Sequence, residues 1–124
     1  MIKITDTSEE DVKKKTKSFL LDSNSRPSAI LAATDSIAIF VMNQLLKMGI
    51  KIPEDISICG IDNIHISQHS SIQLTSVGDS INKNMGEIAI THLIDIIEMK
   101  KNDVASMQIT LDPKLFDRKT TAYK

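Results

Sequence analysis

The chain has 124 residues, enough for one domain, and 41% of them are apolar while 25% are charged, a balance that excludes a disordered tail and a collagen-like repeat. The formal net charge is -1 and the longest run of lysines, at positions 13–17, is short, so the segment offers no extended basic face for nucleic acid. Cys59 is the only cysteine and no apolar run approaches the roughly 18 residues of a membrane span, so we expect no disulfide, no membrane partner and a cytoplasmic location.

The first half of the chain predicts helices that alternate with strands. Ser8 and the acidic residues after it are typical of a helix start, and apolar residues at helical spacing follow. The apolar run 29–33 indicates a buried parallel strand, and the β-branched run 56–61 indicates a second one. Between them we expect a helix over 35–48 that stops at a glycine. The segment 2–5 is a candidate for one more strand.

The second half of the chain is less regular. Residues 74–77 predict a strand, 81–99 a helix with one apolar face, and 107–111 a final strand that ends at the Asp112–Pro113 turn. Alternating elements with short links favour an α/β fold with a parallel sheet and flanking helices. No internal repeat or low-complexity linker divides residues 1–124, so we interpret them as one domain.

The helix predicted over 35–48 is apolar around most of its circumference. Its apolar residues are Ile37, Ala38, Ile39, Phe40, Val41, Met42, Leu45 and Leu46. One face of a sheet cannot cover all of them, because a helix that packs on a single neighbour needs only one apolar stripe. Either other parts of the fold bury the far side, or that side meets a partner chain. We favour the partner chain, since exposed apolar patches of this extent are rare on monomers.

Polar side chains follow the two buried strands where each strand ends. Thr34 and Asp35 come after the first strand, and Asp62 and Asn63 come after the second. The carboxyl ends of parallel strands share one edge of a sheet, which is where open α/β sheets bind ligands. We therefore expect these residues to form a ligand site in which Asp62 accepts hydrogen bonds from hydroxyl groups. The alternatives are ordinary, because Asp35 also suits a helix cap and an Asp-Asn pair often only makes a turn.

No motif in the sequence predicts catalysis, a metal or a cofactor. His65 and His69 are four residues apart, but no glutamate lies between them as in a zinc protease, so we interpret them as surface residues. His92 lies on the apolar face of its helix, and Cys59 lies within an apolar strand, positions typical of core residues. A glycine-rich phosphate loop and a G-x-S-x-G nucleophile turn are both missing from the sequence. We therefore predict that the chain is not an enzyme.

Four segments of the chain match a set of recurring motifs. Residues 27–38, PSAILAATDSIA, resemble the pattern P-[ST]-A-I-x-A-x-[NT]-D-x-x-A, and 52–63, IPEDISICGIDN, resemble V-P-x-D-[IV]-S-V-x-G-[FY]-D-[DN]. The segment 74–77, LTSV, resembles the L-T-[TS]-V crossover, and 115–121, LFDRKTT, resembles the closing L-x-x-R-x-S/T-T. Each motif alone is short, but their order and spacing cover most of the chain. Taken together, the segments resemble the lactose/galactose repressor family of bacterial transcriptional regulators.

The resemblance implies a two-lobed, periplasmic-binding-protein-like sensor whose effector lies between the lobes. Residues 1–124 correspond to the C-terminal part of its effector-binding and dimerisation domain, an incomplete lobe. The helix-turn-helix, the hinge and the first lobe would precede this segment, so operator DNA would be contacted only through them. The resemblance also implies that the helix predicted over 81–99 packs on that first lobe. The implied function is the control of operator binding by a sugar or sugar phosphate effector.

The resemblance assigns roles to individual residues as well. The family's sugar-contacting aspartate falls on Asp62, and its polar residue before the strand-end aspartate, often asparagine, is Thr34 here. Thr34 together with Asn63 resembles the Gram-positive catabolite-control branch, whose regulators also answer to a phosphorylated carrier protein. A homodimer interface is implied on residues 37–46 of the predicted helix and on residues 65–71. The residues we assign to it are Ile37, Ile39, Phe40, Met42, Leu46, Ile66 and Ser70.

Two other classes of protein remain as alternatives. A periplasmic sugar-binding protein shares the fold and differs by a signal peptide upstream. An open-sheet α/β enzyme is the second alternative, and turnover of a sugar phosphate that is lost on Asp62→Ala would support it.

Overall fold

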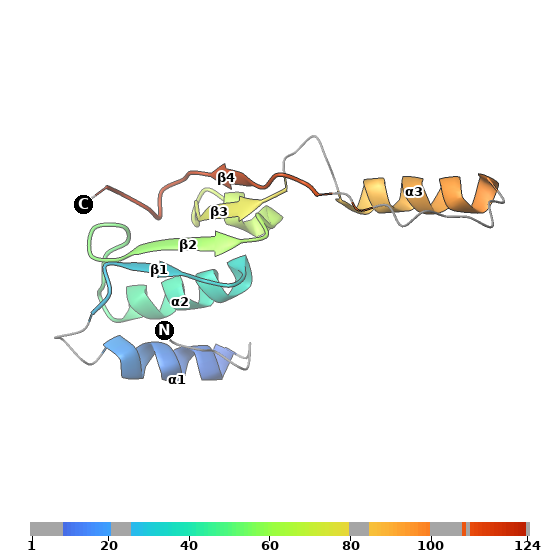
Figure 1. Cartoon of the computed structure of the whole chain (residues 1–124). Coiled ribbons are helices and arrows are strands. Elements are labelled where there is room, and N and C mark those ends of the chain that lie inside the picture. The colour runs from blue at the N-terminus through green and yellow to red at the C-terminus, as the bar shows by residue number, and fades with distance from the viewer. Residues whose placement is uncertain (1–8, 21–25, 80–84, 100–107, 109, 124) are drawn as a thin grey trace.

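The computed structural model describes residues 9–20, 26–79, 85–99, 108 and 110–123 (Figure 1). Its elements, in chain order, are α1 (Glu9–Leu20), β1 (Ala29–Leu31), α2 (Asp35–Lys47), β2 (Ser57–Ile61), the short 3-10 helix η1 (His65–Gln68), β3 (Thr75–Gly78), α3 (Met85–Met99) and β4 (Lys114–Phe116). The candidate strand at 2–5 lies outside the described residues.

The strands form one sheet in the order β1-β2-β3-β4. β1, β2 and β3 are parallel, and β4 pairs antiparallel with β3. The predicted α/β class is confirmed, with the refinement that the sheet is mixed rather than wholly parallel. Of the two apolar runs predicted to form buried strands, β2 is mostly buried, whereas β1 is the edge strand and is mostly exposed, so the prediction of burial was wrong for β1.

The core lies between the sheet and α2. Ile58 and Leu74 are fully buried on the side of the sheet that faces α2, and Ala38 and Leu45 of α2 are fully buried against them. α1 packs on α2, and its Leu20 belongs to the same buried cluster. The second helix therefore has two neighbours, the sheet and α1, which accounts for much of its apolar circumference.

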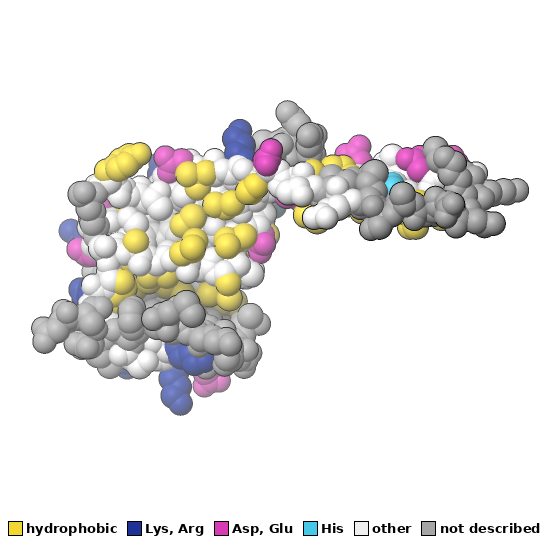
Figure 2. Space-filling view, viewed as in Figure 1, with side chains coloured by type: hydrophobic (Ala, Val, Ile, Leu, Met, Phe, Trp, Pro, Cys, Tyr) yellow, Lys and Arg dark blue, Asp and Glu magenta, His cyan; other side chains and the backbone are white. Residues whose placement is uncertain are grey.

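The other face of the sheet is apolar and largely open. Residues paired across neighbouring strands lie on one face, and so do residues two apart in a strand. By this rule Leu31, Cys59, Ile61, Val77 and Leu115 share a face, and the three with the longest side chains, Leu31, Ile61 and Leu115, are exposed. Figure 2 shows hydrophobic side chains gathered over the strands.

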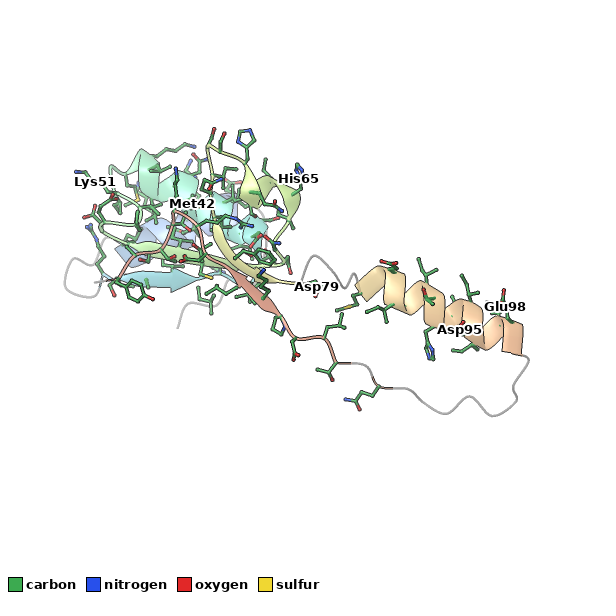
Figure 3. The ribbon with its side chains drawn as sticks, turned by 90° about the horizontal axis from the view of Figure 1, so that it is seen from above. Met42, Lys51, His65, Asp79, Asp95 and Glu98 are labelled. Atoms are coloured by element: carbon green, nitrogen blue, oxygen red, sulfur yellow. The ribbon has the colours of Figure 1, made fainter. Side chains whose placement is uncertain are left out.

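α3 stands apart from the sheet and the other two helices (Figures 1 and 3). Within the described residues it packs on none of the other elements, so most of its apolar side chains are exposed. These are Met85, Ile90, Leu93, Ile94 and Ile97. The predicted helix over 81–99 is confirmed from residue 85 onward, and residues 81–84 lie outside the described part of the chain.

The final strand was predicted at the wrong position. We expected it over 107–111, but Gln108, Thr110 and Leu111 are not in a strand, and residues 107 and 109 are outside the described residues. The strand is instead β4, which follows the Asp112–Pro113 pair rather than preceding it. Its position is set by antiparallel pairing of Lys114–Phe116 with Ser76–Gly78, a tertiary contact that local sequence does not encode.

Candidate functional site

Three strand ends define the edge at which the candidate site lies. Because β1, β2 and β3 are parallel, the residues that follow them, Thr34, Asp62 and Asp79, lie at the same edge of the sheet. Thr34 is the N-cap of α2, with extended backbone at φ -144°. Its Oγ1 accepts a hydrogen bond from the backbone N–H of Ile37 at 3.3 Å, so the cap of α2 is Thr34 rather than Asp35.

Asp35 lies inside the protein and joins the loops of this edge to one another. Its side chain is 0% exposed. Oδ2 accepts hydrogen bonds from the backbone N–H of Ile64 at 3.0 Å and from Oγ of Ser67 at 2.6 Å, while Oδ1 accepts from Oγ of Ser76 at 2.6 Å. One carboxylate thereby connects the start of α2 to the segment after β2 and to β3.

Gly60 makes room for this carboxylate. A Cβ atom at Gly60 would lie 2.2 Å from Oδ1 of Asp35 and 3.1 Å from its Cα. The glycine in the middle of β2 is therefore required by the close approach of α2, which is a common reason for glycine within a strand.

The turn at Asp62 and Asn63 has an unusual backbone that its neighbours hold in place. Both residues have positive φ, 106° and 50°, a region that residues other than glycine enter at a cost. The N–H of Asp62 donates to the carbonyl of Val77 at 2.8 Å, and the N–H of Asn63 donates to Oγ of Ser76 at 3.0 Å. Gly78 lies beneath the turn, since a Cβ there would be 2.6 Å from the Cβ of Asn63.

Arg118 holds the same turn from the C-terminal segment. Its guanidinium donates to Oδ1 of Asn63 and to the carbonyl of Leu74, and its backbone N–H donates to Oγ1 of Thr75 at 3.0 Å. The guanidinium also lies 5.5 Å from the centre of the Phe116 ring. We did not predict a site role for this residue, and the only signal for one was its place in the closing motif L-x-x-R-x-S/T-T.

The four candidate ligand residues are thus in different situations. Thr34, Asp62 and Asn63 lie at one edge and are linked through Asp35. The carboxylate of Asp62 is exposed and makes no hydrogen bond to another described residue, whereas the side-chain oxygen of Asn63 is occupied by Arg118. Asp35 has both oxygens bonded within its own chain and no exposed surface, so the structure favours a positioning role for it over a ligand contact.

Comparison with known proteins gives the family of this domain. Residues 2–121 match the periplasmic binding protein-like domain family. The chain belongs to that family. This periplasmic-binding-protein-like domain is 33% identical over 95 residues to the HTH-type transcriptional repressor PurR of Vibrio vulnificus (strain CMCP6), a match that covers 77% of the domain and 28% of the repressor. The chain thus spans less than a third of the length of that relative.

Solved structures of LacI-family regulators are also similar to this domain. The domain is 28% identical, with a TM-score of 0.76, to a LacI family transcriptional regulator from Enterococcus faecium with bound ribose, covering 93% of the domain and 41% of that chain. It is also 28% identical, with a TM-score of 0.78, to a LacI-family regulatory protein from Corynebacterium glutamicum, covering 95% of the domain and 44% of that chain. These matches confirm the resemblance to the effector-binding region of lactose/galactose-type regulators. The assignment to the catabolite-control branch stays a prediction.

The residues assigned to a dimer interface fall into two groups in the periplasmic-binding-protein-like domain. Ile37 and Met42 are buried in the core of their own chain, so the fold itself explains why they are apolar, and Ile39 and Phe40 are partly buried against the same core. The remaining residues face outward. Leu46 is 59% and Ile66 46% exposed, and Ser70 is exposed. The fold therefore explains the buried part of the apolar helix, and a partner chain on its exposed part stays a prediction.

The remaining candidate residues offer no second site. His65 is the first residue of η1 and His69 follows its end, and both are exposed. Among the described residues, no three His, Cys, Asp or Glu side chains lie close enough to hold a metal ion. Burial raises the pKa of the Cys59 thiol, and the negative charge of Asp35 raises that pKa further. None of the described helices is long and apolar enough to cross a membrane.

Proposed function

We propose that this domain is the ligand-sensing part of a sugar-responsive transcriptional repressor, and that Asp62 and Thr34 contact the effector. The observation that carries the proposal is the exposed carboxylate of Asp62, which bonds no other residue in the described part of the chain and lies on a turn that is fixed from several directions. A fixed carboxylate can accept hydrogen bonds from adjacent hydroxyl groups without first being ordered, which favours affinity. The hydroxyl of Thr34 lies at the same edge and keeps its proton free to donate.

A small polyhydroxylated molecule fits this set of groups best. Sugar hydroxyls can donate to Asp62 and accept from Thr34, and the solved relative from Enterococcus faecium holds ribose. A sugar phosphate is the second candidate, because Lys114 begins β4 at the same edge, opposite Gly78. The repressor function of the curated relatives supports a regulatory rather than a catalytic role for the domain.

Operator DNA would be bound by parts of the full protein other than this domain. The near-neutral charge of the chain provides no electrostatic term of the kind that dominates DNA affinity. The domain would act instead through a coupling free energy, in which effector binding changes the arrangement of the full protein and so its affinity for DNA. We place this function in the cytoplasm. Regulation by a phosphorylated carrier protein would accompany it if the domain belongs to the catabolite-control branch.

We also propose that the domain forms a homodimer through the outward-facing residues Leu46, Ile66 and Ser70, with Ile39 and Phe40 at the border of the surface. Leu46 lies near the end of α2 and Ile66 lies in η1, and an exposed leucine and isoleucine are side chains that suit a self-complementary interface. The double variant Leu46→Asp/Ile66→Asp is expected to give monomers in light scattering at micromolar concentration. The control Ile90→Asp, on α3, should leave the oligomeric state unchanged. A monomeric wild-type chain would contradict this proposal.

A ligand titration tests the effector site. The full chain is titrated with ribose and with ribose 5-phosphate, and binding is followed by amide chemical shifts of residues 62–64. Asp62→Ala should abolish the response, because the acceptor for the sugar hydroxyls is lost. Glu54→Ala is the matched control, since it removes an exposed carboxylate before β2, at the opposite edge of the sheet. An unchanged response in Asp62→Ala would exclude the assigned site.

A further inference from the structure

We propose that Arg118 is a positioning residue for the effector site, which fixes the turn that carries Asp62 and makes its geometry depend on β4. The proposal rests on the proposed function, because it concerns the same turn. It goes beyond that function by naming a residue that contacts no effector and yet sets the effector affinity.

The turn requires support from outside itself. Asp62 and Asn63 both have positive φ, and neither is glycine. Such a conformation persists only where surrounding contacts favour it over the ordinary backbone regions. The direction in which the Asp62 carboxylate points is therefore decided by the groups that hold the backbone of both residues and the side chain of Asn63.

Those groups act on different atoms of the turn. Val77 and Ser76 of β3 accept hydrogen bonds from the backbone N–H groups of the turn, which fixes the distance between the turn and β3. Among the described residues, only Arg118 binds the side chain of Asn63. The donor of this hydrogen bond is the charged guanidinium, so the bond is stronger than a hydrogen bond between neutral groups.

Arg118 is itself fixed. Its guanidinium divides its donors between the carbonyl of Leu74 and Oδ1 of Asn63, and the Phe116 ring lies 5.5 Å away. The planar guanidinium reaches two acceptors at once with fixed geometry, which the single ammonium of lysine cannot reproduce. The residue thus works as a rigid spacer between β3, the turn and the segment after β4.

Because Arg118 follows β4 in the chain, its hydrogen bond to Asn63 links the turn to the position of β4. β3 ends and β4 begins at the edge of the sheet where the site lies, with Gly78 opposite Lys114. In the sequence, α3 lies between these two strands. Arg118 follows β4 by two residues. A displacement of β4 relative to β3 therefore moves the donor on which the Asn63 side chain depends. The effector affinity of the turn should respond to how the returning strand is placed.

The test is a double-mutant cycle between Arg118 and Asn63 in the full chain, with ribose as the probe. Arg118→Met and Asn63→Ala should each weaken ribose binding by about tenfold, the loss expected for one charge-assisted hydrogen bond. The double variant should bind no more weakly than either single variant, because both remove the same contact. Arg118→Lys should give an intermediate affinity. Additive losses, or unchanged affinity in Arg118→Met, would overturn the proposal.

A control separates positioning from general stability. Thr120 lies two residues beyond Arg118 and is buried, and it bonds the carbonyl of Ile58 and the N–H of Thr75 rather than the turn. Thr120→Val should lower the melting temperature and leave the ribose affinity of the folded protein unchanged. A loss of affinity equal to that of Arg118→Met would show that Arg118 acts only through stability.

A second readout does not need a ligand. The three-bond HN–Hα coupling and the amide shift of Asn63 report its positive φ in the free protein, and both should change in Arg118→Met but not in Thr120→Val. If the wild type does not bind ribose, the ribose proposal fails while these signals still decide the role of Arg118. Unchanged Asn63 signals in Arg118→Met would refute it.

Discussion

Asp35→Ala is expected to lower the free energy of unfolding by about 3–6 kcal/mol. The substitution leaves three donors without their acceptor: the buried hydroxyls of Ser67 and Ser76 and the part-buried N–H of Ile64. Each donor left unsatisfied costs about 1–3 kcal/mol, and we expect the sum to stay in the lower part of its range of about 3–9 kcal/mol, because the hydroxyls can turn partly toward other acceptors and the N–H of Ile64 is only part-buried. The loss is comparable with the total stability of a small domain, about 5–15 kcal/mol.

Urea unfolding of the full chain, followed by far-UV circular dichroism, measures this loss. Asp35→Asn should cost only about 1–2 kcal/mol, because its carbonyl oxygen still accepts from Ile64 and Ser67 while its amide faces Ser76. Glu54→Ala, an exposed carboxylate, should change stability by less than about 0.5 kcal/mol. A loss for Asp35→Ala as small as that of Glu54→Ala would refute the assigned role.

The close approach of Asp35 to Gly60 allows a second test of the position of the Asp35 carboxylate, in which both residues are substituted. Gly60→Ala places a Cβ 2.2 Å from Oδ1 of Asp35, so it should be strongly destabilising in the wild type. In the Asp35→Ala background that oxygen is gone and only the contacts at 3.1 Å, to the Cα of residue 35 and to Leu74, remain. The two substitutions should therefore cost at least about 1 kcal/mol less together than the sum of their separate effects. Strict additivity would show that the two side chains do not meet.

Three further predictions follow from individual contacts. Gly78→Ala should destabilise the chain by roughly 1–3 kcal/mol in urea and shift the amide signal of Asn63, because the new Cβ would lie 2.6 Å from the Cβ of Asn63. Thr34→Ala should cost about 1 kcal/mol by loss of the α2 cap, whereas Thr34→Ser should cost little. The pKa of Cys59 is raised, so its alkylation rate should reach half-maximum at a higher pH than that of a free thiol. Since the folded state holds this proton more tightly than the unfolded state, stability should fall as pH rises above the ordinary thiol pKa, and Cys59→Ser should remove that fall.

The elements set by local signals were predictable from the sequence. α2 was expected over 35–48 and extends over Asp35–Lys47, and the glycine expected to end it, Gly49, has φ 74°. β2 was expected over 56–61 and extends over Ser57–Ile61. In both cases the evidence, a capping residue, a terminal glycine or a run of β-branched residues, lies within the element itself.

The role of Asp35 could not be predicted in the same way. Its partners Ile64, Ser67 and Ser76 lie 29, 32 and 41 residues further along the chain. The two interpretations of Asp35 from the sequence were a helix cap and a ligand contact, because both follow from its place between a strand and a helix. The available signal was Gly60, since a glycine within an apolar strand indicates that another group approaches the backbone closely. Pairing that glycine with an aspartate at a strand end would have suggested a buried carboxylate.

The hydrogen bonds of the Asp62 turn suggest how an effector could control a larger protein. The backbone of the Asp62 turn is bonded to β3, and its Asn63 side chain is bonded to the segment after β4. These two strands connect the sheet to α3, and Asp79, where the chain leaves β3, lies between the sheet and that helix (Figure 3). An effector that binds best to one geometry of the turn stabilises the strand arrangement that produces it, and by linkage that arrangement raises the affinity for the effector by the same factor. Under the proposed function, coupling between ligand and lobe position would therefore need no path through the core, because the turn is bonded directly to β3 and to the segment that follows β4.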